Sequence, residues 1–184
     1  AEYLKKAGYA TGMFGKWHLG DNYPFRPPDQ GFDESYMHAA GGIGQPGDFY
    51  ENYLKGDSSY FNPVLSHNGN KVHTTGYCSD VYTDQALRFM ETHANQQFFI
   101  YLTFNAPHEP LQLPERYLKM YSDIPPEKFA EGTDPRRLPL SEREIEAARR
   151  VFGMVTNIDD NMGRLFRRIN ELELAERTLV IFLT

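Results

Sequence analysis

The stretch FFIYLTF, residues 98–104, is an unbroken apolar run rich in aromatic side chains. A short run without polar alternation is typical of a strand that is covered on both faces of a parallel sheet. Upstream of it, apolar side chains recur at helical spacing and predict a helix that begins at Ser79 or Asp80 and ends near Ala94. We therefore expect a helix followed directly by a buried strand.

A second helix and a second apolar strand are expected downstream. Ser141 and Glu144 have the spacing of a capping box, and apolar residues then repeat mostly by three or four as far as Leu172. Residues 178–183 form another apolar run. A strand, a helix and a further strand make a right-handed βαβ crossover, so the predicted fold class is α/β with a mainly parallel sheet flanked by helices.

The first eighty residues predict a short strand and a long excursion. Tyr9–Phe14 is partly β-type and is closed by Gly15. Residues 21–78 show no sustained periodicity, and an irregular stretch of this length is usually functional or covers a site. Asn68-Gly69 lies between two short extended pieces and predicts a tight hairpin turn.

Composition excludes several classes of protein. The 184 residues are 40% hydrophobic and 24% charged, with a net charge of −6, which is typical of a globular chain and not of a disordered one. The sequence has no basic stripe of the kind that would predict nucleic-acid binding. No apolar run approaches the roughly 20 residues that a membrane span needs. The single cysteine, Cys78, excludes an intrachain disulfide. Both termini suggest a cut chain, so we expect a fragment, incomplete at both ends.

Three side chains near predicted strand ends form the candidate site. Lys16 and His18 follow the first strand and point to the same side if the extended geometry persists, with Trp17 turned the other way to pack. His108 lies in a proline-rich loop after the FFIYLTF strand. Ligands of parallel α/β sheets bind beyond the carboxyl ends of the strands, so we expect the three to converge there. A lysine and two histidines suit an oxyanion substrate.

The other candidate residues are predicted to be structural or solvated. Four histidines lack a comparable setting: His38, His67, His73 and His93. Asp159 and Asp160 look like a paired-carboxylate site, but neighbours on a helix point about 100° apart. We therefore expect a structural role for this pair.

Four stretches, in order along the chain, resemble the sulfatase family: GYATGMFGKWHLG (Gly8–Gly20), PPDQGFDE (Pro27–Glu34), NAPHEP (Asn105–Pro110) and VTNIDDNMGRL (Val155–Leu165). The resemblance implies an alkaline-phosphatase-like fold and hydrolysis of sulfate esters by a formylglycine nucleophile beside a calcium ion. By motif position, Lys16 would bind the sulfate and the formylglycine. His18 would hydrogen-bond the formylglycine hydrate and help to expel sulfate, and His108 would bind the sulfate or protonate the leaving oxygen.

The chain also departs from the family pattern. The C/S-x-P/A-x-R sequence that supplies formylglycine is absent, and Cys78 is followed by Ser-Asp-Val. The early Asp pair and the Asp-Asn-Gly that ligate calcium are also missing, as is a further downstream lysine. Residues 1–184 are thus expected to be the central part of a sulfatase catalytic domain, inactive alone, with no metal ligands of their own. Calcium and formylglycine are expected in the full-length parent, whose location the family suggests to be periplasmic, extracellular or lysosomal.

Alternatives remain open at this point. A phosphonate or phosphate ester hydrolase of the same superfamily would use the same lysine and histidines on another tetrahedral oxyanion. A non-catalytic glycan-binding module would instead use the aromatic residues between Tyr23 and Tyr60 as stacking platforms. The expected partner is a sulfated small molecule or glycan, without nucleic acid or membrane.

Overall fold

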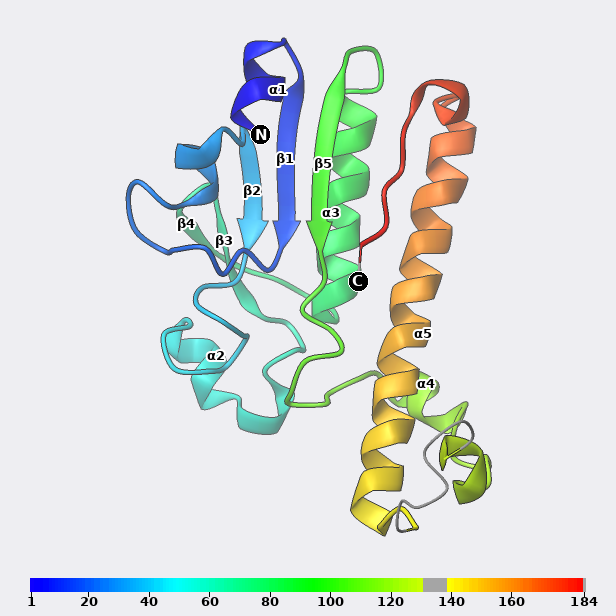
Figure 1. Cartoon of the computed structure of the whole chain (residues 1–184). Coiled ribbons are helices and arrows are strands. Elements are labelled where there is room, and N and C mark those ends of the chain that lie inside the picture. The colour runs from blue at the N-terminus through cyan, green and yellow to red at the C-terminus, as the bar shows by residue number, and fades with distance from the viewer. Residues whose placement is uncertain (131–138, 184) are drawn as a thin grey trace.

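The computed structural model describes residues 1–130 and 139–183 (Figure 1). The helices are α1 (Glu2–Lys6), α2 (Tyr50–Leu54), α3 (Cys78–Thr92), α4 (Glu115–Lys119) and α5 (Glu142–Glu171). The strands are β1 (Ala10–Gly15), β2 (Glu34–Met37), β3 (Val64–His67), β4 (Asn70–His73) and β5 (Phe98–Thr103). These elements carry and surround the candidate site.

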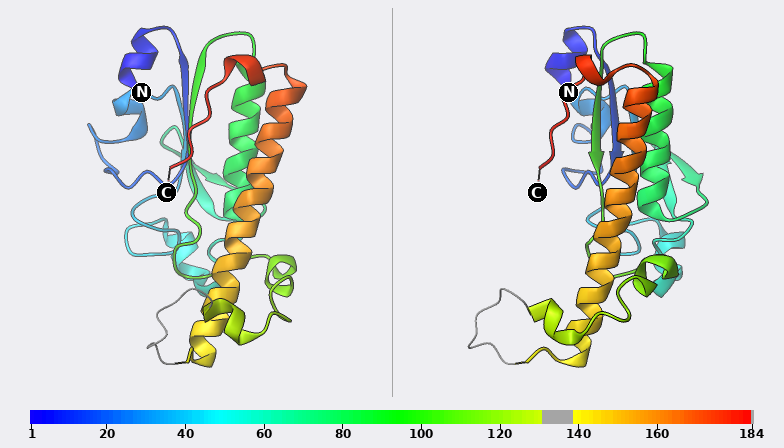
Figure 2. Two further views of the ribbon diagram at one scale, coloured as in Figure 1. Left: turned by 45° about the vertical axis from the view of Figure 1, so that its right-hand side comes forward. Right: turned by 90° about the vertical axis from the view of Figure 1, so that its right-hand side faces the viewer.

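The strands form one mixed sheet in the order β4-β3-β2-β1-β5. β1 pairs in parallel with both β2 and β5, whereas β3 and β4 are antiparallel. Figure 2 shows α3 and α5 stacked on one face of this sheet and α1 on the other. The predicted α/β class is confirmed, and the parallel part of the sheet consists of β2, β1 and β5.

The register brings three strand ends to one edge of the sheet. Gly15, the last residue of β1, lies opposite Met37 of β2 on one side and Thr103 of β5 on the other. The loops that leave these strands therefore start side by side at the carboxyl edge, which we call the rim. The rim is where ligands of open parallel sheets bind.

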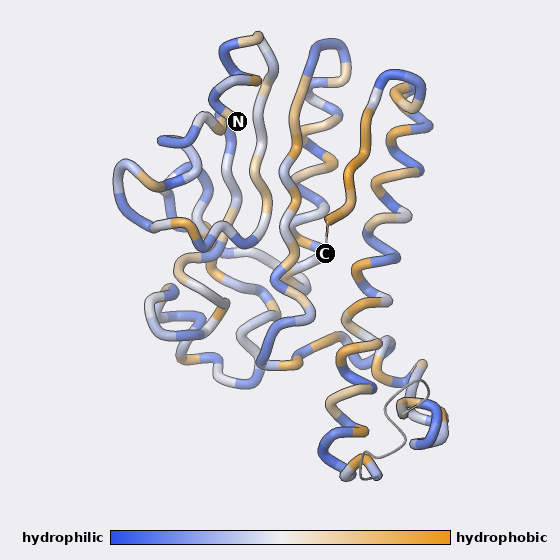
Figure 3. Tube along the Cα trace, viewed as in Figure 1, coloured by the Kyte–Doolittle hydropathy of each residue, from blue (hydrophilic) through white to orange (hydrophobic). Residues whose placement is uncertain are grey.

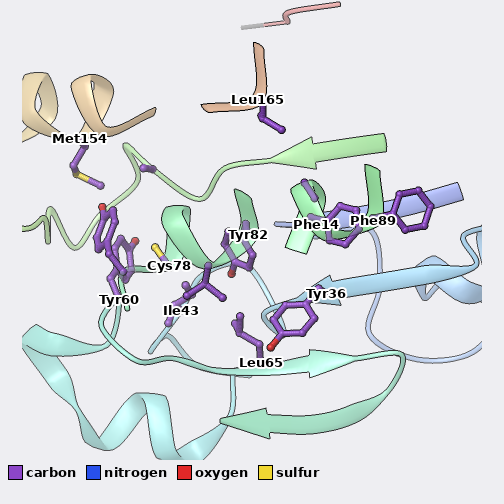
Figure 4. Packing of buried hydrophobic residues seen from close by; sticks show 14 of the residues in the cluster. Phe14, Tyr36, Ile43, Tyr60, Leu65, Cys78, Tyr82, Phe89, Met154 and Leu165 are labelled. Carbon is purple, nitrogen blue, oxygen red and sulfur yellow. The ribbon is translucent and has the colours of Figure 1, made fainter. Parts of the chain in front are cut away.

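The larger core cluster lies between the sheet and α3, and α5 packs beside α3 and contributes to it. Its buried side chains include Phe14 from β1, Tyr36 from β2 and Tyr82 from α3 (Figure 4). Phe14 and Phe89 meet edge to face at 5.6 Å between ring centroids. Cys78 is fully buried among these residues.

The predicted long helix is present in full. Its N-terminus has the expected capping box, because Ser141 Oγ accepts from the backbone N–H of Glu144 and Glu144 Oε2 accepts from the N–H of Ser141. Its inner face contributes Met154, Leu165 and Ile169 to the core. The helix runs without interruption through its two glycines.

The predicted start of α3 needs a small correction. The N-cap is Tyr77, and Asp80 lies inside the first turn. The Oδ1 atom of Asp80 accepts hydrogen bonds from the side-chain amides of Asn157 and Asn161 on α5, at 2.8 and 2.7 Å. Both amides are buried, so Asp80 ties the two helices together instead of capping its own.

Two strand predictions are wrong in part. β5 is a strand, but it lies at the edge of the sheet, and Tyr101 is 40% exposed, so it is not covered on both faces. Residues 178–183 form no strand: their side chains are largely exposed, and Figure 3 shows them as a continuous hydrophobic stretch. An apolar sequence favours a strand only where a neighbouring strand pairs with it, and within residues 1–130 and 139–183 nothing pairs with this one.

The excursion holds one confirmed element and one that the sequence does not reveal. The hairpin of β3 and β4 turns at Asn68 and Gly69, which have φ of 49° and 85°, as the Asn-Gly signal predicts. β2 has no such signal. It is only four residues long, and a strand this short shows too little alternation to be recognised.

Candidate active site

Lys16 leaves β1 through a glycine that no other residue could replace. Gly15 has φ of 119°, and a Cβ atom there would lie 1.7 Å from the carbonyl oxygen of Thr103. This closeness lets the backbone N–H of Lys16 donate to Thr103 O at 2.8 Å, and Thr103 Oγ1 donate to Lys16 O at 2.6 Å. Lys16 is therefore clamped to the end of β5 at the rim.

His18 reaches the rim by a turn, which corrects the expected extended geometry. Its φ is 49°, in the left-handed region, so alternation of side chains does not persist past Gly15. Trp17 does pack away from the site: its ring meets Phe32 edge to face at 5.8 Å, and its Nε1 donates to Phe25 O at 2.8 Å. The exposed His18 ring lies beside Gly41, where a Cβ atom would come within 2.9 Å of Nε2.

His108 lies in the loop that follows β5, and its ring is fixed by its own neighbour. Its Nδ1 lies 2.6 Å from the carbonyl oxygen of Glu109. Because a carbonyl only accepts, Nδ1 carries the proton and Nε2 is left as the outward nitrogen. The backbone N–H of His108 donates to Asn105 O at 3.0 Å.

His38 is a rim residue that the sequence does not single out. It follows β2 directly, and continuation of the parallel register places it beside Lys16. The ring is fully buried, with Nδ1 2.9 Å from the hydroxyl of Tyr82 and with no hydrogen-bond partner for Nε2 among the described residues. No local pattern reveals this setting, because the burial of His38 depends on α3.

The electrostatic surroundings of His38 link it to the three predicted site residues. The pKa of His38 is lowered to about 3, first by burial and then, in smaller measure, by the nearby side chains of Lys16, His18 and His108. These three side chains belong to two loops that are far apart in sequence, yet all three act on the one buried imidazole of His38. This arrangement fits the expected convergence at the carboxyl edge.

A second buried polar group lies at the same edge. Asn105, the second residue after β5, is 3% exposed, and neither atom of its side-chain amide makes a hydrogen bond of normal geometry within the described ranges. An unpaired buried amide costs free energy. The Asn105 amide and the Nε2 atom of His38 are therefore two buried polar groups near the rim that have no hydrogen-bond partner among the described residues.

The described residues do not fit calcium or formylglycine. Across residues 1–130 and 139–183, no group of three His, Cys, Asp or Glu side chains could hold a metal ion. Cys78 is fully buried on α3, where burial raises the pKa of its thiol to about 12, so this thiol is inert as a nucleophile. Neither a calcium ligand nor the nucleophile is therefore assigned to a side chain in these ranges.

Asp159 and Asp160, for which the sequence predicts a structural role, lie on α5. Asp160 accepts a hydrogen bond from the hydroxyl of Tyr117 on α4 at 2.8 Å. Both carboxylates line a cavity of about 670 Å³ between α3, α4 and α5. Among the charged side chains that line this cavity, Arg164 forms an ion pair with Asp84, and Asp80 accepts from Asn161.

The mixed sheet with helices packed against it defines the chain as an α/β protein, and the loops that leave β1 and β5 at the carboxyl edge carry the candidate oxyanion site. The chain belongs to the Sulfatase family, whose model matches residues 1–184. It is similar to an arylsulfatase of Klebsiella aerogenes, with 28% identity over 215 residues that cover 100% of this chain and 46% of the relative. The family resemblance of the four motifs is thereby confirmed.

Similar solved structures agree with this family assignment. The crystal structure of Ps i-CgsB in complex with k-i-k-neocarrahexaose has a TM-score of 0.69 and 28% identity, and the match covers 94% of this chain and 36% of that one. A phosphonate monoester hydrolase from Silicibacter pomeroyi matches less well, with a TM-score of 0.53, 18% identity and coverage of 93% and 43%. The alkaline-phosphatase-like fold is confirmed by the first match. The chain spans less than half the length of each of these proteins.

The helices have no membrane-spanning character. Within the ranges that the structure describes, none is both long enough and apolar enough to cross a bilayer.

Proposed function

We propose that residues 1–184 are the central part of a sulfatase catalytic domain whose full-length protein hydrolyses sulfate esters of a carbohydrate or aryl compound. The observation that supports the proposal is that Lys16 and His18 leave β1, and His108 follows β5, at adjacent strand ends, where Gly15 lies opposite Thr103. A sulfate ester presents an anionic tetrahedral group and a leaving oxygen that needs a proton. A cation and two imidazoles at one edge supply both requirements.

Each of the three residues has a distinct task in this proposal. The Lys16 ammonium binds a sulfate oxygen as a point charge. His18 donates a hydrogen bond near the departing sulfate, as its motif position implies. His108, whose Nδ1–H is taken by Glu109 O, presents Nε2 to the substrate and, when protonated, gives that proton to the leaving oxygen. Within residues 1–130 and 139–183 no cluster of side chains could hold calcium, and the sequence lacks the C/S-x-P/A-x-R segment that would supply the formylglycine.

Substitution of Lys16 and His108 in the full-length protein tests the proposal. Lys16→Ala should raise KM and lower kcat/KM for every sulfate ester, because the sulfate is common to all of them. His108→Ala should lower kcat by about 10² to 10⁴ on an unactivated sugar sulfate, the range for losing a general acid. An activated aryl sulfate needs little protonation and should lose less. Equal losses on both substrates would exclude the general-acid role.

The substrate class is proposed to be a sulfated glycan. Large apolar side chains stand exposed on the loop that follows the GKWHLG motif, including Tyr23 at 78% and Phe25 at 57%. Such rings could stack on a sugar. The same rings also support the alternative of a binding module without catalysis. Glycan binding that persists in a Lys16→Ala/His18→Ala variant, without any turnover by the wild type, would favour the module.

The phosphonate or phosphate ester hydrolase remains a second candidate within the fold, because a neighbour of that activity shares it. Comparison of kcat/KM on an aryl sulfate, an aryl phosphate and a phosphonate monoester decides between them. A sulfatase should prefer the sulfate.

A further inference from the structure

The carbonyl oxygen of Glu109 is a meeting point of hydrogen bonds from three parts of the chain. It accepts from His108 Nδ1 at 2.6 Å, from the hydroxyl of Tyr60 at 3.0 Å and from Gln45 Nε2 at 3.0 Å. Tyr60 and Gln45 come from the long excursion, 49 and 64 residues away in sequence. Three donors, two of them from a distant part of the sequence, therefore hold this one carbonyl oxygen.

Tyr60 is itself rigidly held. Its side chain is fully buried, and its hydroxyl also lies 3.1 Å from His108 O. Its backbone N–H donates to Gln112 Oε1 at 2.8 Å, and the Gln112 amide donates to Gly56 O at 3.1 Å. Burial raises the pKa of the Tyr60 phenol, which therefore remains an O–H donor. The Tyr60 hydroxyl thus holds the carbonyl groups of residues 108 and 109 in place.

We infer that Tyr60 and Gln45 are positioning residues that hold the Glu109 carbonyl against His108 Nδ1, so that Nε2 is the only nitrogen offered to the substrate. A histidine that donates its second N–H to a fixed carbonyl has one tautomer and one ring orientation. Without that carbonyl the ring could turn about χ1 and χ2, or carry its neutral proton on Nε2. The inference deepens the proposed function and rests on it, because it concerns the residue that would protonate the leaving oxygen.

The charges around His108 are compatible with this arrangement. The groups near the rim are Lys16 and His18 from the loop after β1, the neutral His38 from the end of β2, and the Asp21 carboxylate. That carboxylate accepts from Ala40 N–H, whereas the hydrogen bond of His108 Nδ1 goes to Glu109 O. The backbone carbonyl is therefore the acceptor that sets the tautomer.

Tyr60→Phe in the full-length protein tests the inference, with Tyr77→Phe as a matched control. Tyr77 is also buried, and its hydroxyl also donates to a backbone carbonyl, that of Gln112, at 2.8 Å. Both variants lose buried hydrogen bonding, but only the first loses a contact to Glu109 O. We expect Tyr60→Phe to lower kcat on an unactivated sugar sulfate by about 10- to 100-fold, with KM unchanged, because misplacement of a catalytic group costs rates of that order.

The leaving group and a double-mutant cycle separate positioning from stability. On an activated aryl sulfate, the loss for Tyr60→Phe should stay within about 3-fold, and in a His108→Ala background the same substitution should have no further effect. Tyr77→Phe should leave the rates on both substrates unchanged. Gln45→Met, which removes the second donor from a half-buried position, should reproduce the pattern of Tyr60→Phe at smaller size if the tyrosine variant fails to fold.

Equal losses for Tyr60→Phe and Tyr77→Phe on both substrates, or no loss for either donor variant, would overturn the inference. If His108→Ala shows the expected leaving-group dependence while the donor variants do not, only the positioning role fails. If His108→Ala shows no such dependence, or the wild type hydrolyses no sulfate ester, the proposed function fails and the inference with it.

Discussion

At the scale of one residue, the buried surroundings of His38 keep its imidazole in the neutral form. Its ring is buried, hydrogen-bonded to Tyr82 through Nδ1, and close to the side chains of Lys16, His18 and His108. Protonation would place a positive charge in this buried position, next to the Lys16 ammonium. The pKa of His38 is accordingly lowered from the usual 6.5 to about 3.

This lowered pKa predicts a loss of stability in acid. The unfolded chain binds a proton at His38 below about pH 6.5, whereas the folded chain does not until about pH 3. The contribution of neutral His38 to the free energy of unfolding is therefore complete above pH 6.5 and is lost as the pH falls towards 3. The loss is about 1.4 kcal/mol per pH unit, or about 2 kcal/mol at pH 5. Denaturant unfolding of the full-length protein at several pH values measures it.

His38→Gln should flatten this acid slope, because glutamine does not titrate. His73→Gln is the control, since the ring of His73 is exposed on β4 and the variant should keep the slope of the wild type. Parallel stability curves for the wild type and His38→Gln would show that His38 is not the group responsible.

Gly41 gives a second prediction at the scale of one residue. A Cβ atom at this position would meet the far end of the His18 ring at 2.9 to 3.0 Å, so Gly41→Ala should push that ring aside without touching the core. We expect kcat on a sulfate ester to fall by about 10-fold or more, while the free energy of unfolding changes by less than about 1 kcal/mol.

The control for Gly41→Ala is Gly163→Ala on α5. The nearest atom to the added methyl there is Arg167 Nη1 at 3.5 Å, an ordinary contact. This variant should keep full turnover and gain up to about 1 kcal/mol of stability from helix propensity. Unchanged turnover in Gly41→Ala would show that His18 either tolerates displacement or has no role in turnover.

At the scale of elements, the N-terminus of α5 depends on its capping box. Ser141→Ala removes the Oγ atom that accepts a hydrogen bond from Glu144 N at the first turn of the helix. The expected loss is about 1 kcal/mol in the free energy of unfolding, measured by urea titration. Ser141→Asp retains an acceptor at the cap and should lose much less. If both variants are equally destabilised, side-chain capping is not what fixes this end of the helix.

The hairpin and β2 illustrate how elements cooperate at the rim. β3 pairs with β2 and so fixes the strand that carries His38 to the edge. The loop beyond β2 then returns to the site, where Ala40 N–H donates to the carboxylate of Asp21 from the loop after β1. The excursion therefore supports the candidate site from one side.

At the scale of the whole molecule, the isolated 184-residue chain should not hydrolyse an aryl sulfate, even with calcium added. The sequence contains no C/S-x-P/A-x-R segment, and its one cysteine is buried in the core. A purified chain assayed beside the full-length protein measures this. Turnover by the chain alone that Lys16→Ala abolishes would mean that its nucleophile has been misplaced.

Local order in this protein was largely predictable from the sequence. The capping box at Ser141, the Asn68-Gly69 turn and the glycine that ends β1 act through neighbours within a few residues, so their signals are visible in the chain itself. The motifs that contain Lys16, His18 and His108 can also be recognised in the sequence. The sequence alone thus determined the α/β class, the family resemblance and the candidate cations.

Only the tertiary structure decided how these parts meet. The placement of β5 at an edge, the burial of His38 under Tyr82 and the donors from Tyr60 and Gln45 to Glu109 O all join residues 44 or more positions apart or depend on strand order. The apolar run at 178–183 failed as a strand for the same reason. Periodicity reports which face of an element is apolar, whereas pairing partners and unpaired polar atoms are properties of the packed chain.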